Sequence, residues 1–137
     1  MKSLILKGGL GNQLFQLATF YMLKENYFLK DIKLDLSSGF NLDFKYKRKL
    51  EIFEDNNMYY CSFIHEKLNL ILLILNKFFP ALIKILPVII INDGNFEKFI
   101  RSSGFQNKYL IFNGYFQNSK IVNNQLEVPL GQKQGLR

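Results

Sequence analysis

A glycine-rich turn near the start of the chain separates a short apolar run from a segment with helical periodicity. The run Leu4-Ile5-Leu6 predicts a buried strand, and the residues from about Asn12 to Tyr27 predict a helix. Residues 32–36 alternate between apolar and polar side chains and predict a second strand. A strand, a helix and a strand at this spacing predict a βαβ unit with parallel strands and a right-handed crossover.

The first helix has a recognisable apolar spacing and start signal. Its apolar face is predicted from residues three and four apart, which are Leu14, Leu17, Ala18 and Tyr21, widened by Phe15 and Met22. Asn12 is predicted to be the N-cap, because its side-chain oxygen can accept a hydrogen bond from an unpaired backbone N–H group.

The remaining segments predict an α/β fold with a parallel sheet flanked by helices. Residues 88–91 and 109–112 are predicted strands, and residues 96–100 are a predicted short helix. Residues 64–86 are predicted to be helical, and the long apolar run from residue 68 to 91 is interrupted by Lys77, Lys84, Pro80 and Pro87. We expect one or two helices there that pack on the sheet, with contact to a membrane surface left as an alternative.

Length and charge restrict the domain organisation and the class of partner. The chain has 137 residues and a net charge of +7, which fits one domain and an anionic partner. Residues 1–124 are predicted to form this domain, and residues 125–137 an irregular tail. The basic cluster Lys45, Lys47, Arg48 and Lys49 lies in residues 37–57, which are predicted to be an irregular loop.

The single cysteine and the single histidine limit the available chemistry. Cys61 cannot form an intrachain disulfide, and with His65 it provides no zinc cluster. The two side chains form a nucleophile and a base only if the fold brings them together. Because no signal-peptide core precedes the first strand, the protein is expected to be cytoplasmic.

The segment from Lys7 to Gln16, Lys-Gly-Gly-Leu-Gly-Asn-Gln-Leu-Phe-Gln, predicts an anion site. A glycine turn before a helix collects free N–H groups at the positive end of the helix dipole. Gly9 and Gly11 also match the first two glycines of an NAD-type dinucleotide-binding fingerprint, with Asp35 near the position of the ribose contact. Leu14 occupies the place of the third glycine, and a simple tight turn before a capped helix is a further alternative.

Two consecutive amides, Asn12 and Gln13, follow the turn and favour a sugar or diphosphate ligand. We do not expect a simple turn to require Gln13 or Gln16.

The string from Gly8 to Gln16 resembles the N-terminal motif of the family 11 glycosyltransferases, the α-1,2-fucosyltransferases. The segment Gly114-Tyr115-Phe116-Gln117 resembles an aromatic segment of the same family. The resemblance runs from Met1 to about Lys120. It implies a GT-B architecture with two Rossmann-like domains, of which this chain is the N-terminal one.

The resemblance also implies an activity and a set of partners. The family transfers fucose from GDP-fucose to the 2-hydroxyl of a galactoside with inversion and without a catalytic metal. By resemblance, Gly9, Gly11, Asn12 and Gln13 would line the donor cleft, and no catalytic residue is assigned. The partners would be a sugar nucleotide and a galactoside glycan rather than nucleic acid, with peripheral contact to the inner membrane left open.

The chain departs from the family after its second motif. The family motif His-x-Arg-Arg-Gly-Asp, which resembles a clamp on the donor diphosphate, is missing from this sequence. We therefore expect a truncated or frameshifted reading frame with little or no activity on its own. Two other functions stay open, a small membrane-associated interaction protein and an NAD-type dinucleotide-binding domain.

Overall fold

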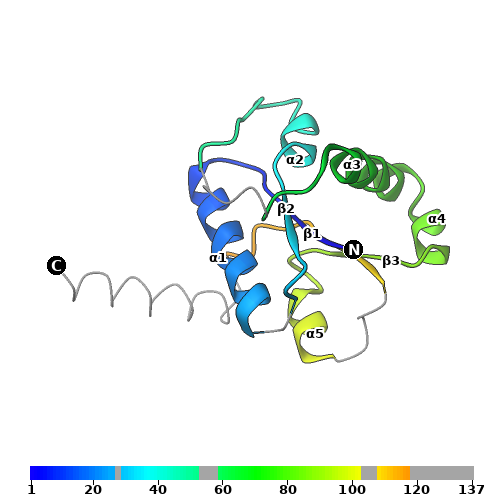
Figure 1. Ribbon diagram of the computed structural model, residues 1–137. Helices are drawn as coiled ribbons and strands as arrows, with labels where there is room; N and C mark the ends of the chain where they lie inside the picture. The colour runs from blue at the N-terminus through cyan, green and yellow to red at the C-terminus, as the bar shows by residue number, and fades with distance from the viewer. Residues whose placement is uncertain (27–28, 53–58, 103–107, 118–137) are drawn as a thin grey trace.

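The computed structural model describes residues 1–26, 29–52, 59–102 and 108–117 (Figure 1). One parallel sheet has the strand order β2-β1-β4-β3. Its strands are β1 (Lys2–Ile5), β2 (Lys33–Asp35), β3 (Val88–Ile91) and β4 (Tyr109–Phe112). The helices of the described part are α1 (Leu10–Asn26), α2 (Ser38–Asn41), α3 (Phe63–Phe78), α4 (Pro80–Ile85) and α5 (Phe96–Arg101).

Helices cover both faces of this sheet, so the predicted α/β fold with a parallel sheet is confirmed. On one face, α1 and α5 pack on side chains such as Leu4, Leu110 and Phe112. On the other face, α3 and α4 pack on Ile5 and Ile111 (Figure 1). The strands predicted at residues 88–91 and 109–112 have the same bounds in the structure. The predicted tail, residues 125–137, lies outside the described residues.

The connections after β1 and β2 indicate which edge of the sheet can bind a ligand. The chain leaves β1 toward the α1 face and leaves β2 toward the α3 face. In parallel α/β sheets, ligands bind at the carboxyl ends of strands whose connections diverge in this way. The third strand lies at the far edge from β2, whereas in the 3-2-1 order of dinucleotide-binding folds it would lie beside β2.

Helix α1 differs from its prediction in two respects. It begins at Leu10, and Gly9 accepts the first helical hydrogen bond from the N–H of Gln13, so Asn12 is not the N-cap. The predicted apolar face is only partly correct, since Leu14 is 50% exposed while the other five predicted residues are buried or half-buried against the core. The fully buried side chains are on the opposite face of the helix and are Gln13, Gln16, Thr19, Phe20 and Leu23. The apolar periodicity failed because two of the inward-facing positions are amides.

The segment predicted as an irregular loop at residues 37–57 contains a short helix, α2, and its residues 53–57 lie outside the described residues. The carboxylate of Asp35 accepts the backbone N–H groups of Ser37 and Ser38 at 3.0 and 2.8 Å and so holds the first turn of α2. A Cβ atom at Gly39 would lie against the carbonyl oxygen of Leu6 and 2.7 Å from the Cβ of Lys7. Glycine at this position therefore lets α2 pack directly on the end of β1.

The apolar stretch predicted at residues 64–86 forms two helices, α3 and α4, with Phe79 between them and Pro80 as the first residue of α4. Leu72 and Leu73 of α3 and Ile83 of α4 are buried against the sheet. In the described ranges, none of the helices combines the length and the apolar character needed to cross a bilayer.

Substitution of Gly39 by alanine is expected to lower the free energy of unfolding by about 1–3 kcal/mol, because the added methyl group overpacks against backbone. Urea unfolding measures this change. The matched control is Gly11→Ala, since a Cβ atom at Gly11 meets nothing within 4 Å and alanine favours the helix. Equal losses of unfolding free energy in the two variants would show that α2 does not pack tightly on the end of β1.

Candidate functional site

Two segments about one hundred residues apart meet at the carboxyl edge of the sheet. The amide of Gln16 accepts the backbone N–H of Lys7 at 2.9 Å and donates to the carbonyl oxygen of Gly114 at 3.1 Å. The amide of Gln117 donates to the side-chain oxygen of Asn12. The glycine-rich turn after β1 and the aromatic segment after β4 therefore form one continuous surface.

The side chain of Gln13 is fully buried and cross-links loops. Its nitrogen donates to the carbonyl oxygens of Gly8 at 2.9 Å and Lys49 at 3.0 Å. Its oxygen accepts the N–H of Glu51 at 2.9 Å. Because the donors and the acceptor of this amide are all engaged, Gln13 holds the loops and does not offer its side chain to a ligand, contrary to the expectation. The expectation that a turn needs neither Gln13 nor Gln16 is also wrong, because both amides hold this turn in place.

The other predicted site residues lie at or near the surface. A Cβ atom at Gly9 or Gly11 would meet nothing within 4 Å, so both glycines border open space. Asn12 is partly exposed. The first turn of α1 carries no acidic side chain, and the first N–H groups of a helix have no partner within it. This end of α1 therefore retains its positive dipole.

Gly8 has the backbone conformation that makes this turn tight. Its φ angle is +80°, and a Cβ atom there would lie 2.7 Å from the amide nitrogen of Asn12 and 2.9 Å from the ring of Tyr115. Only glycine fits this combination of dihedral angle and close approach.

A hollow of about 470 Å³, which we call the edge hollow, lies beside this surface. Its walls are the ends of β1 and β4, the helix α2 and the loop that follows α2. Its charged lining residues are Lys7, Asp43, Lys45 and Arg48. Three cationic side chains to one carboxylate favour an anionic ligand. The predicted residues Gly9, Gly11, Asn12 and Gln13 are not among its lining residues, although Gly8 is.

Lys7 is a functional candidate that the sequence patterns did not single out. Its side chain is half-buried at the end of β1, and its Nζ atom lies 4.9 Å from the centre of the Tyr115 ring. Burial lowers the pKa of this lysine, and the nearby carboxylate of Asp93 partly opposes that shift. An anion entering the edge hollow would favour the charged form of Lys7. The sequence feature that could have indicated Lys7 is its position, directly between the first strand and the glycine turn.

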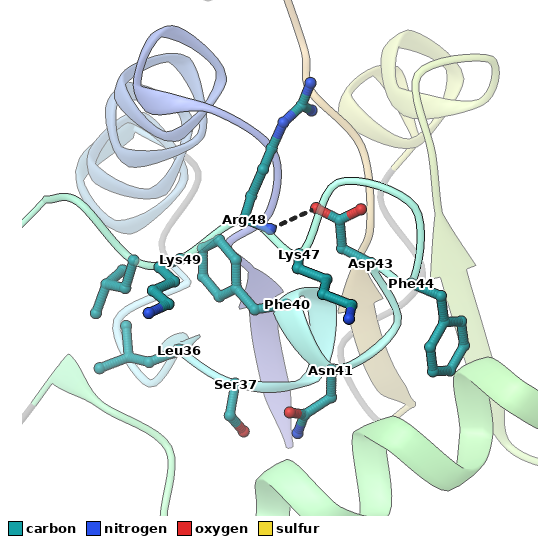
Figure 2. A pocket seen from close by; sticks show the side chains of 10 residues that line it. Leu36, Ser37, Phe40, Asn41, Asp43, Phe44, Lys47, Arg48 and Lys49 are labelled. Atoms are coloured by element: carbon teal, nitrogen blue, oxygen red, sulfur yellow. Dashed lines mark hydrogen bonds between the residues drawn. The ribbon is translucent and has the colours of Figure 1, made fainter.

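The basic cluster also borders a second hollow, of about 490 Å³, beyond the end of β2 (Figure 2). The carboxylate of Asp43 accepts the backbone N–H groups of Arg48 at 3.0 Å and Tyr46 at 3.1 Å. These hydrogen bonds lower the pKa of Asp43, and the one from the N–H of Arg48 has the largest effect. The cluster is therefore a folded turn between two hollows, and Arg48 contributes to both.

Asp35 is not available as a ribose contact. Its side chain is fully buried, and one of its oxygens accepts the hydroxyl of Ser38 at 2.6 Å and the amide of Asn69 at 2.8 Å. The hydroxyl of Tyr109 donates to Asn69 at 2.7 Å, and burial raises the pKa of Tyr109 to about 12. This network joins α2 and α3 to the sheet and has a structural role.

Cys61 and His65 have separate environments. Burial, with the negative charges of Asp35 and Glu66, raises the pKa of the Cys61 thiol to about 12. The Nδ1 atom of His65 lies 2.8 Å from the hydroxyl of Ser62, which is the N-cap of α3. The thiol is therefore protonated at neutral pH and is not an activated nucleophile.

Residues 1–26, 29–52, 59–102 and 108–117 contain no cluster of three or more His, Cys, Asp or Glu side chains that could hold a metal ion. Comparisons with protein-family models, with curated proteins and with solved structures gave no match.

The variant Gln16→Leu is expected to destabilise the protein, because it leaves the N–H of Lys7 and the carbonyl of Gly114 without their partner. Each buried group left unpaired costs about 1–3 kcal/mol, measured by urea unfolding. The control Leu14→Gln changes an exposed position of the same helix and should be nearly neutral. A small loss for Gln16→Leu would contradict the assigned cross-link.

Alkylation of Cys61 by iodoacetamide should be slow in the folded protein. A rise of the thiol pKa from 9.0 to about 12 lowers the thiolate fraction at neutral pH about a thousandfold. The rate is measured by mass spectrometry, with the urea-unfolded chain as the control. Equal rates in the folded and unfolded states would contradict a half-buried, protonated thiol.

Proposed function

We propose that this chain forms the nucleotide-facing α/β domain of a glycosyltransferase of the α-1,2-fucosyltransferase type. Its donor would be GDP-fucose and its acceptor a galactose-containing glycan. The observation that carries the proposal is the meeting of the two segments on which the family resemblance rests. The segments contact each other through Gln16 and Gly114 and through Asn12 and Gln117.

The charges around this surface support a diphosphate ligand. The first turn of α1, the Lys7 ammonium group and the edge hollow with Lys45 and Arg48 all favour negative charge. In the proposed reaction, negative charge grows on the β-phosphate as GDP leaves the fucose. Fixed N–H groups and cations near that position stabilise the developing charge without reorganisation.

The roles of the predicted residues follow from their accessibility. The backbone of Gly9 and Gly11 would approach the donor closely, since no side chain stands in the way. Asn12 would contact the donor or acceptor from the first turn of α1. Gln13 would act as a positioning residue through the loops that it cross-links.

A GT-B enzyme places its donor between two domains, so this domain is expected to bind GDP-fucose weakly and to turn it over little by itself. The sequence provides no Arg-Arg pair to clamp the diphosphate. In this proposal the main contacts to the nucleotide would come from the His-x-Arg-Arg-Gly-Asp motif of a second domain.

The test is a titration of the ¹⁵N-labelled chain with GDP-fucose, followed by NMR. The backbone amides of Gly9, Gly11 and Tyr115 are expected to shift. The variant Lys7→Met should weaken binding about tenfold, the loss expected for one hydrogen bond to a charged group. Its stability should not fall, because burial already disfavours the charged lysine.

The control variant is Lys30→Met, which removes the same charge from an exposed position just before β2, at the opposite end of the strands. It should leave binding unchanged. Tighter binding of NAD than of GDP-fucose, or shifts confined to other parts of the chain, would refute the proposal.

A further inference from the structure

The outer side of α3 and α4 is an apolar surface that no described segment covers. Ten of the sixteen large apolar side chains exposed in the described part of the chain lie between residues 63 and 86. The most exposed are Phe63, Ile64, Phe78 and Ile85, at 65–79%. Figure 1 shows both helices at the outside of the molecule, on the face away from α1 and α5.

The helix α3 is apolar on both of its sides. Leu72 and Leu73 face the sheet, while Ile64, Ile71 and Phe78 are exposed on the other side. An exposed apolar patch of this kind, rimmed by polar side chains, marks an interaction site.

The charges on these helices identify the partner. Glu66 is the only acidic residue between positions 63 and 86, and its carboxylate faces inward, where it accepts the hydroxyl of Ser37 at 2.8 Å. The exposed charged side chains of this surface are all lysines, namely Lys67, Lys77 and Lys84. Two of them lie beside exposed rings, Lys67 at 5.0 Å from Phe63 and Lys77 at 5.6 Å from Phe78. The surface is thus apolar with a purely cationic rim.

We infer that the outer face of α3 and α4 binds the surface of an anionic lipid bilayer. Apolar side chains would enter the boundary between head groups and acyl chains while the lysine ammonium groups contact lipid phosphates. The helices would lie in the plane of the surface, as expected for helices too short to span the bilayer. This inference is independent of the proposed donor site, which lies at the carboxyl edge of the sheet.

The experiment is flotation of the full chain with vesicles of phosphatidylcholine alone or mixed with phosphatidylglycerol, at low and high salt. Binding is expected only to the mixed vesicles and should weaken at high salt. The triple variant Lys67→Gln, Lys77→Gln, Lys84→Gln is expected to lose about 100-fold in binding, from roughly fivefold per lysine at an anionic surface. The control triple variant Lys45→Gln, Lys47→Gln, Lys49→Gln loses the same charge elsewhere and should bind normally.

A third variant removes apolar contacts from the same face, with Ile71→Ser, Phe78→Ser and Ile85→Ser. It should unfold at the same temperature or higher and lose vesicle binding. Equal losses in the two lysine variants would overturn the inference, because attraction would then follow net charge alone. It would also be overturned by an absence of flotation, or by a wild-type dimer that the serine variant converts to a monomer, since the face would then belong to a second copy.

Discussion

The buried amides of Gln13 and Gln16 are the interactions on which the carboxyl edge of this fold depends. Gln16 joins the turn after β1 to the loop after β4, and Gln13 joins the same turn to the loop that follows α2. Both side chains are fully buried, and their hydrogen bonds are buried or partly buried, so loss of a partner is costly. Three loops from distant parts of the sequence therefore have one fixed arrangement, and the surface between them is preorganised.

This arrangement separates the residues that build the site from those that can contact a ligand. The amides hold the loops, while the glycine backbone, the first turn of α1 and Lys7 remain next to open space or the edge hollow. A preorganised set of N–H groups and cations suits a diphosphate, because little rearrangement is needed when charge develops. In our proposal the edge of the sheet accordingly serves the nucleotide sugar, and the outer face of α3 and α4 holds the domain at a lipid surface.

Much of the fold was predictable because its strands are short and apolar and its turns contain glycine. The strands at residues 88–91 and 109–112 and the α/β class follow from such local patterns. The buried face of α1 was not predictable in this way, because Gln13 and Gln16 occupy inward positions that an apolar pattern assigns to the surface. Asp35 is a similar case, since only the packing of α2 and α3 shows that its oxygens are occupied by Ser38 and Asn69.

Local sequence patterns were enough to predict the order of the strands and of the longer helices, and the glycine turn before the first helix, since these depend on periodicity and backbone freedom over a few residues. The residues that meet across the sheet follow from tertiary packing. It brought Gly114 and Gln117 to the turn after β1, gave Lys7 its half-buried position and left one side of α3 uncovered. Long-range strand pairing sets these neighbours, and the identity of a residue's spatial neighbours determines whether a polar side chain supports the fold or remains available to a ligand.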